Sequence, residues 1–235
     1  RVIFMDQYKL SILDMANRFQ KIRSANIYDV LDEMGYPFQT LNLDIKPLKE
    51  DMRIAGAAFT IQGYRYPEKL DEDSNQSGFE RVYQSLFEGC VVVVNPEKGS
   101  EGVGCFGEMT SWCLKQHGAR GILVDGGIRD RMGLLEIPDW SVFVRYTSHI
   151  ESNGRWMIKD VQTPISLTGQ LQTQVRVRPG DFIVGDCDGV VVIPREIVEE
   201  VLIKAEKVEE VEQKSREDLA GGALFEEVFK KYGRA

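Results

Sequence analysis

The chain has 235 residues, of which 43% are hydrophobic and 28% charged, and its net charge at pH 7 is −8. A chain of this length and composition buries a core without disulfide staples, so we expect one globular domain over residues 1–235. The acidic balance disfavours nucleic acid as the main partner. No apolar run approaches the roughly 20 residues of a membrane span. Four scattered cysteines without a C-x-x-C pair favour a reduced, cytoplasmic protein.

The N-terminal segment, about residues 5–35, predicts two helices. Apolar periodicity predicts the first over about 5–22, and Ser24 is the expected N-cap of a second that ends at Gly35. The sequence then predicts a strand at 55–63. A polar surface loop is expected at 64–78, and a short helix at 79–88.

The centre of the chain contains continuous apolar runs, which are typical of strands buried on both faces. Such strands are expected at 90–95, 121–127 and 141–146. A helix is expected between the first two, at 108–118. Paired strands are expected next, as a hairpin near 155–160 and 173–178 and as two strands across the Asp188-Gly189 turn within 181–194. Helices over about 195–232 close the chain. This order predicts an α/β domain with a mixed sheet flanked by helices.

A glycine-rich segment, with Gly102, Gly104 and Gly107 in a G-x-G-x-x-G pattern, precedes the central helix. A dinucleotide site is one interpretation, with Asp125 as the ribose-binding acid, but its glycine turn should follow the strand at once. Here residues 95–101 intervene. Alternatively, the glycines allow close backbone approach to a ligand, or they form a simple helix-capping loop. The first-turn N–H groups of Met109 and Thr110 would then offer an anion site.

The second motif, DGGIRD at residues 125–130, directly follows a predicted buried strand. Arg129 offers a planar fork of donors for a carboxylate or enolate, and Asp130 offers hard oxygen for a divalent cation. A structural Arg–Asp ion pair in a tight turn is the alternative. With only His117 and His149 available, carboxylates would be the main metal ligands, which indicates Mg²⁺ or Mn²⁺.

Glu108, twenty intervening residues and then Arg129-Asp130 resemble the signature of the 4-hydroxy-4-methyl-2-oxoglutarate aldolases and their RraA-like relatives. The segments IYDVLDEMG, RIAGAAFTIQG and VRPGDFIVGDCDGVVVIP occur in family order, and the resemblance covers about residues 20–232. The acid here is Glu where the best-characterised aldolases have Asp, which lengthens the side chain. The resemblance implies an α/β/β/α sandwich of the swivelling-domain type.

The same resemblance implies roles for individual residues. Asp130 would bind the metal directly, while Glu108 and a neighbouring subunit's Glu212 would act through water. Glu209 and Glu210 leave the register of that last match open. Arg129 would contact the keto oxygen and stabilise an enolate, and Gly107, Met109 and Thr110 would bind the substrate carboxylate. The implied assembly is a homotrimer or a pair of trimers with sites between subunits.

The implied activity is a Mg²⁺-dependent, class II cleavage of 4-hydroxy-2-keto diacids to pyruvate, with oxaloacetate decarboxylation through the same pyruvate enolate. The substrate would be a small 2-keto acid such as 4-hydroxy-4-methyl-2-oxoglutarate. An RraA-like regulator that binds and inhibits a ribonuclease of the RNase E type is the alternative. An older family label, menaquinone methyltransferase, finds no support in the glycine loop, which lies too far from its strand for nucleotide-type cofactor binding.

Overall fold

The computed structural model describes residues 8–68 and 72–233, although the side chains of residues 72–77 are not described. The helices are α1 (Ile12–Phe19), α2 (Ser24–Glu33), α3 (Glu72–Tyr83), α4 (Glu108–Gln116), α5 (Arg131–Glu136), α6 (Val198–Ala220) and α7 (Phe225–Tyr232). The strands are β1 (Lys46–Pro47), β2 (Ile54–Arg65), β3 (Cys90–Asn95), β4 (Ala119–Ile128), β5 (Ser141–Thr147), β6 (Trp156–Val161), β7 (Ile165–Thr168), β8 (Gln174–Val177), β9 (Phe182–Gly185) and β10 (Val190–Ile193).

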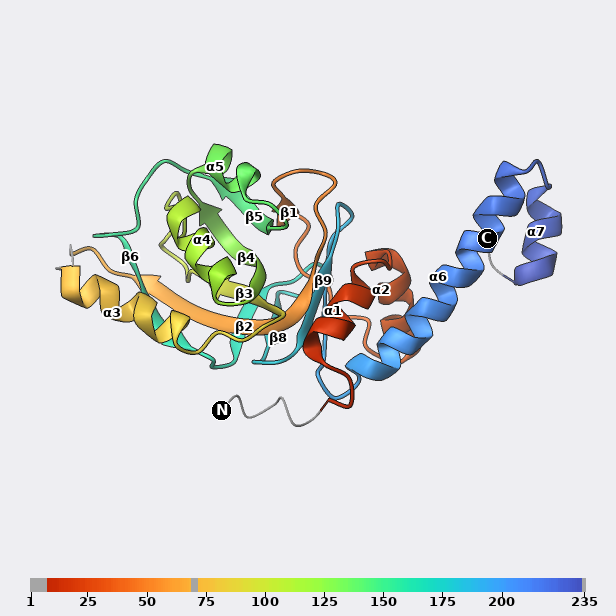
Figure 1. Ribbon diagram of the computed structural model, residues 1–235, viewed down its shortest axis with the longest axis horizontal. Coiled ribbons are helices and arrows are strands. Elements are labelled where there is room, and N and C mark those ends of the chain that lie inside the picture. Colours follow the sequence, from red (N-terminus) through yellow and green to blue (C-terminus); the bar gives the residue numbers. More distant parts are fainter. Residues whose placement is uncertain (1–7, 69–71, 234–235) are drawn as a thin grey trace.

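Eight strands form one curved sheet in the order β1-β5-β4-β3-β2-β9-β10, with β6 also paired to β2 (Figure 1). Strands β2, β3, β4 and β5 run parallel, and the other strands join them antiparallel. The predicted α/β class with a mixed sheet flanked by helices is therefore confirmed. The parallel centre matters for function because successive strands end at one edge, where their loops meet.

Alternation along each strand divides the core between the two faces of the sheet. Val92 and Val94 of β3 pack in the larger core with helices α1, α2, α4 and α6. Val91 and Val93 face the other way and pack with strand residues that include the β7–β8 hairpin. The continuous apolar sequence of β3 follows from burial on both faces.

Both N-terminal helices are shorter than the sequence indicated. Ser11 accepts a hydrogen bond from the Asp14 N–H at 3.1 Å, so α1 begins at Ile12, and residues 5–7 of the predicted helix lie outside the described residues. Ser24 is the first helical residue rather than the cap. Its hydroxyl donates to Asp186 Oδ1 at 2.6 Å, which removes it from the capping role.

Three predictions about the middle of the chain are wrong. The loop predicted at 64–78 is partly regular, because β2 continues to Arg65 by pairing with β6 and α3 begins at Glu72. The helix predicted at 79–88 is the second half of α3, which ends at Tyr83. The predicted hairpin also pairs differently: β6 joins β2, whereas β8 joins β7. Long-range pairing with β2 stabilises β6, and local sequence carries no signal for it.

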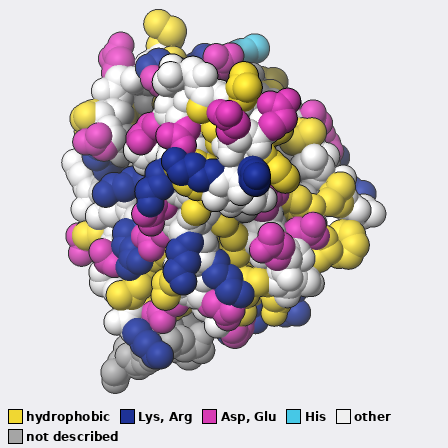
Figure 2. All heavy atoms as spheres, turned by 90° about the vertical axis from the view of Figure 1, so that its right-hand side faces the viewer, with side chains coloured by type: hydrophobic (Ala, Val, Ile, Leu, Met, Phe, Trp, Pro, Cys, Tyr) yellow, Lys and Arg dark blue, Asp and Glu magenta, His cyan; other side chains and the backbone are white. Residues whose placement is uncertain are grey.

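Helix α6 extends away from the sheet and carries α7 folded back against its end (Figure 1). Figure 2 shows this end of the molecule, with acidic and basic side chains interleaved and hydrophobic side chains exposed between them. Phe225 and Phe229 stack with centroids 6.1 Å apart while each stays about half exposed. Within the described part of the chain, none of the helices is both long and apolar enough to cross a membrane.

The buried thiols generate a chemical prediction. Burial raises the pKa of Cys90 and of Cys105 to about 12, while Cys113 is half-buried and Cys187 is exposed. Thiolates are the reactive species. We therefore expect a disulfide reagent at pH 8 to modify Cys113 and Cys187 rapidly in the folded protein, and all four cysteines after unfolding. Peptide mapping identifies the sites, with Cys187→Ser as the control, and rapid modification of Cys90 would contradict the packing.

Candidate functional site

The glycine loop after β3 runs alongside the end of β4. The Cys105 N–H donates to the Gly127 carbonyl at 3.0 Å, and the Arg129 N–H donates to the Phe106 carbonyl at 2.9 Å. Gly104 also forms a parallel bridge with Gly127. These backbone contacts bring the start of α4 beside the Arg129-Asp130 pair, although more than twenty residues separate them in sequence.

Two glycines of the loop are required by this close approach. A Cβ atom at Gly107 would lie 2.4 Å from Asp130 Oδ2, and one at Gly104 would lie 2.8 Å from Arg129 Cβ. The φ of Gly107 is −142°, which any residue adopts, so the requirement is steric. The glycines serve close packing against Arg129 and Asp130 of the same chain. The predicted close approach to a ligand stays a prediction.

Asp130 is held in an unusual conformation between the two segments. Its φ of 62° and ψ of 40° lie in the left-handed region, immediately before α5. Its carboxylate accepts the Glu108 N–H at 3.3 Å and Arg129 Nε at 3.2 Å. Non-glycine residues in this region are uncommon and cluster at functional sites. The carboxylate retains lone pairs beyond these two contacts, so it can also serve as a metal ligand.

The first turn of α4 combines a capping motif with free donors. The Thr110 hydroxyl donates to the Gly107 carbonyl at 2.9 Å and accepts the Gly107 N–H at 3.0 Å. In the part of the chain that the structure describes, the Met109 and Thr110 N–H groups have no protein acceptor. Donors at a helix N-terminus attract anions. A carboxylate can therefore bind here, within reach of Asp130.

The Glu108 side chain extends toward α5. A Cβ atom at Gly133 would lie 2.0 Å from Glu108 Oε2, so the carboxylate rests on the open backbone of that glycine. Beside it, a cleft of about 470 Å³ is lined by Arg129, Asp130, Arg131, Thr147, Ser148 and His149. The loop after β5 thus completes one wall, and the sequence motif alone did not indicate its contribution.

Asp125, the candidate ribose-binding acid, has a structural role instead. Its side chain is almost fully buried and accepts Arg145 Nε and the Thr168 N–H, each at 2.6 Å. These contacts fasten β4 to β5 and β7. A side chain so buried and bonded within the chain is not presented to a ribose, which agrees with the spacing argument against that fold.

Glu212 lies away from the other predicted site residues within one chain. Its carboxylate accepts Asn26 Nδ2 at 3.0 Å and Arg216 Nη1 at 3.3 Å, in the contact between α2 and α6. Figure 1 places α6 on the opposite side of the molecule from α4 and α5. Glu209 belongs to the same network, whereas Glu210 is exposed and pairs with Lys214. A role for Glu212 at this site therefore requires a second subunit.

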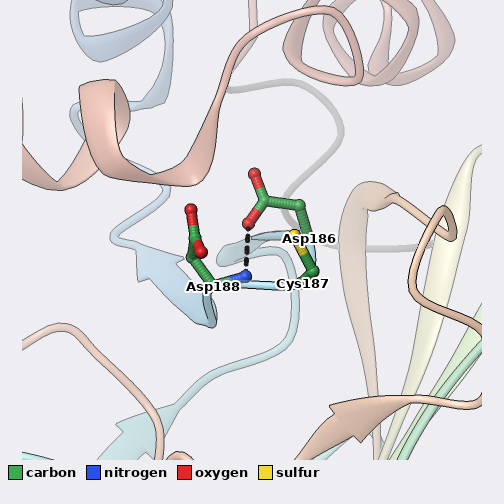
Figure 3. A group of neighbouring side chains, drawn as sticks. All are labelled: Asp186, Cys187 and Asp188. Atoms are coloured by element: carbon green, nitrogen blue, oxygen red, sulfur yellow. Dashed lines mark hydrogen bonds between the residues drawn. The ribbon is translucent and has the colours of Figure 1, made fainter.

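Within the described ranges, one group of three potential ligands lies elsewhere, at Asp186, Cys187 and Asp188 (Figure 3). Sequence analysis did not single it out, although the residues are consecutive. Asp186 already accepts the Ser24 N–H at 2.8 Å, the Ser24 hydroxyl and the Asp188 N–H at 3.0 Å. Through these contacts the group closes the β9–β10 turn and holds the start of α2.

The carboxylates at the edge of the sheet fit a magnesium-type ion better than that turn does. Asp130 and Glu108 supply hard oxygen atoms on adjacent rigid segments. Magnesium in proteins commonly keeps several waters and takes only one or two carboxylates. Asp130 lines the cleft of about 470 Å³, whereas Glu108 is not among the lining residues and its carboxylate lies over Gly133. Within one chain, Asp130 is therefore the carboxylate that the cleft offers to such an ion.

Comparisons with known proteins identify the family and the fold. Residues 24–192 match the family described as RraA-like, Aldolase/RraA. A protein of Halalkalibacterium halodurans, whose name provisionally assigns it as a 4-hydroxy-4-methyl-2-oxoglutarate aldolase, is 33% identical over 83% of each chain. A solved structure described as a cellulase from gut-associated microbes is 30% identical, with TM-score 0.78 over 88% of this chain and 89% of its own. RraAS2 of Streptomyces coelicolor, described as an unusual member of the RNase ES inhibitor RraA family, is 27% identical, with TM-score 0.71 over 86% and 96%.

A single methyl group should disturb this arrangement. Gly107→Ala would place Cβ within 2.4 Å of Asp130 Oδ2, so we expect a loss of about 1–3 kcal/mol in the free energy of unfolding. Urea denaturation measures the change. Gly78→Ala is the matched control, because a Cβ atom there would lie 3.8 Å from its nearest heavy atom. Gly78 is in helix α3, where alanine should raise the free energy of unfolding by up to about 1 kcal/mol. Equal stabilities of the Gly107→Ala variant and the wild type would contradict the close approach.

Proposed function

The chain belongs to the RraA-like family, Aldolase/RraA, and on this premise we propose that it is a divalent-metal-dependent lyase that forms pyruvate. Its substrates would be 4-hydroxy-2-keto diacids such as 4-hydroxy-4-methyl-2-oxoglutarate, and oxaloacetate would be decarboxylated at the same site. The single observation that carries this proposal is the convergence of Glu108, Arg129 and Asp130 beside free N–H groups of α4.

The reaction requires a site that accepts electrons from a breaking carbon–carbon bond. In retro-aldol cleavage, the bond between C3 and C4 breaks, its electron pair enters the keto group as an enolate, and protonation of the enolate gives pyruvate. The 4-hydroxyl loses its proton and becomes the carbonyl of the second product. A divalent cation, when bound, supplies Lewis-acid polarisation of the keto oxygen.

The residues of the chain have separate roles in this scheme. Asp130 and, through water, Glu108 would hold the Mg²⁺ or Mn²⁺ ion. Arg129 would donate to the keto oxygen and stabilise the enolate. The N–H groups of Met109 and Thr110, which Gly107 leaves accessible, would bind the substrate carboxylate. Glu108 would also accept the 4-hydroxyl proton through a water molecule.

The position of Lys115, the one lysine between Glu108 and Asp130 in the sequence, supports the metal route over a Schiff base. Lys115 occupies the far end of α4, where its ammonium group donates to the Pro138 carbonyl. It therefore lies more than one helical turn from Glu108 and points to a different loop. Residues 116–158 contain no lysine, and so the loops that line the cleft supply no amine for a covalent intermediate.

Similarity to RraAS2 motivates a second candidate function, inhibition of a ribonuclease of the RNase E type by protein binding. The two functions can be separated by experiment. Pyruvate release from a panel of 4-hydroxy-2-keto diacids and oxaloacetate tests the lyase. Ribonuclease assays with the wild type and an inactive Asp130→Asn variant test inhibition, and equal inhibition by both without any pyruvate release would favour the regulator.

We expect Asp130→Asn to lower pyruvate formation by about 100-fold or more, because an amide is a poor replacement for an anionic metal ligand. Metal removal by a chelator should have the same effect, and magnesium should restore the wild type alone. Glu136→Gln is the control, since Glu136 is exposed on α5, the short helix that follows Asp130. Full activity after exhaustive chelation would contradict the metal route.

Arg129→Lys tests the geometry of the cation rather than its charge. Lysine retains the positive charge but loses the planar fork, so we expect kcat to fall by about 100-fold, in the range of a lost oxyanion donor. Arg155→Lys, on an exposed loop residue, serves as the control. A near-normal kcat would mean that the Arg129–Asp130 contact is structural.

Mixed subunits test the proposed role of Glu212. Combining Asp130→Asn chains with Glu212→Gln chains should restore up to about a quarter of wild-type activity, because random assembly joins some intact Asp130 sites to intact Glu212 residues. Glutamine preserves acceptors for Asn26 and Arg216. Glu210→Gln is the matched control and should be active without mixing. An assembled but inactive mixture would withdraw Glu212, whereas a fully active monomer would end the shared-site proposal.

A further inference from the structure

A larger cleft, about 960 Å³, lies at the opposite edge of the sheet from the candidate catalytic site. Its walls include Ile54, Ala119 and Ser141, which stand at the amino ends of the parallel strands β2, β4 and β5. The catalytic residues follow the carboxyl end of β4. The volume suits a small ligand, and nothing in the proposed reaction uses this cleft.

Two half-buried arginines stand in the wall of this cleft. Arg120 donates to Asn17 Oδ1 at 2.9 Å and to Gln20 Oε1 at 2.5 Å, both neutral amide oxygens. Arg53 donates to the Gln20 backbone carbonyl at 2.7 Å. Gln20 therefore connects the two guanidinium groups, which retain donors beyond these contacts.

The two arginines differ in countercharge. Across the described residues, no carboxylate forms an ion pair with Arg120, and burial lowers its pKa. Arg53 forms a long ion pair with Asp186 at 3.7 Å, and this carboxylate also accepts hydrogen bonds from Ser24 and Asp188, so the cation without a countercharge is Arg120. A partly desolvated cation without a partner is costly. An anionic ligand would supply the missing charge.

The acidic residues of the cleft stand at its rim. Asp51, Glu88 and Asp139 are exposed, and Asp51 is already paired with Lys49 at 2.7 Å. The half-buried part of the cleft is thus cationic, while its mouth carries Glu88 and Asp139 beside the Lys49–Asp51 pair. This distribution suits a compact oxyanion better than a long polyanion, whose flanking charges would meet the acids.

The cleft is also connected to the catalytic site through two helices. Helix α4 begins at Glu108 and carries Lys115 to the cleft, and α5 follows Asp130 and leads to Pro138 in its wall. Lys115 donates to the Pro138 carbonyl, which joins the far ends of both helices. A ligand in the cleft would therefore contact the segments that position Glu108 and Asp130.

We propose that this cleft is a binding site for a small oxyanion, a phosphate or a polycarboxylate, held by the paired guanidinium groups of Arg53 and Arg120. Planar guanidinium forks match the geometry of both anions. Binding does not depend on turnover, so failure of this proposal would leave the proposed lyase activity untouched.

Calorimetric titration of the full chain with inorganic phosphate and, separately, with citrate tests the proposal. A chelator and constant ionic strength prevent binding through a metal at Asp130 and changes in screening. We expect saturable binding of at least one anion, and the tighter of the two identifies the oxyanion class. Trp140 lines the cleft and is buried, so its fluorescence should change on binding, and Trp140→Phe should remove that signal.

Matched variants assign the binding to the arginines. Arg120→Gln should weaken binding about tenfold or more, the loss expected for a charge-assisted contact. Lys49→Gln removes the same charge from the exposed rim and should change the affinity less than about twofold. If Arg120→Gln fails to fold, Arg53→Gln carries the same expectation.

Three results would overturn the proposal. The first is the absence of saturable binding of either anion at about 20 mM, well above millimolar affinity. The second is an equal loss in Lys49→Gln and Arg120→Gln, which would indicate general charge attraction. The third is binding that survives Arg120→Gln but disappears in Arg129→Gln, which would place the anion at the catalytic site.

Discussion

The contact between the glycine loop and the end of β4 is the constraint on which the site depends. Backbone hydrogen bonds from Cys105 to Gly127 and from Arg129 to Phe106 hold the loop beside the strand. A Cβ atom at Gly107 would displace the Asp130 side chain, and one at Gly104 would lie 3.0 Å from the Arg129 backbone nitrogen. Because this contact is made by the backbone, it fixes the start of α4 and the start of α5 together, whatever substrate the side chains select.

The sheet supplies the rigid support for that contact. Strands β3 and β4 pair in parallel, and their residues pack into cores on both faces. The loops that follow them are therefore anchored at their first residues and cannot drift apart. Asp125 adds a buried ion pair with Arg145 and accepts a hydrogen bond from the Thr168 N–H. These contacts tie β4 to its neighbours shortly before Arg129. A site built on such elements keeps its geometry better than one on free loops.

The two ends of the parallel strands have different electrostatic character. Asp130 and Glu108 place carboxylates beside Arg129 at one edge, which suits a cation and an anionic substrate together. At the other edge, Arg53 and Arg120 are cations whose bonds go mainly to amide oxygens of α1. Helices α4 and α5 span both edges. These two helices therefore connect the edge that carries Asp130 to the edge that carries Arg53 and Arg120.

The sequence by itself determined the α/β class, the buried strands and the adjacency of Arg129 to Asp130, because apolar runs and turn residues act locally. The position of DGGIRD after an apolar run also predicted that Arg129 and Asp130 follow the end of a buried strand, as they do after β4. Tertiary structure alone decided that β6 pairs with β2, that Ser24 bonds Asp186 instead of capping α2, and that Arg53 meets Arg120 through Gln20. Each of these joins residues distant in sequence, and such pairings depend on competition among many partners that no local pattern records.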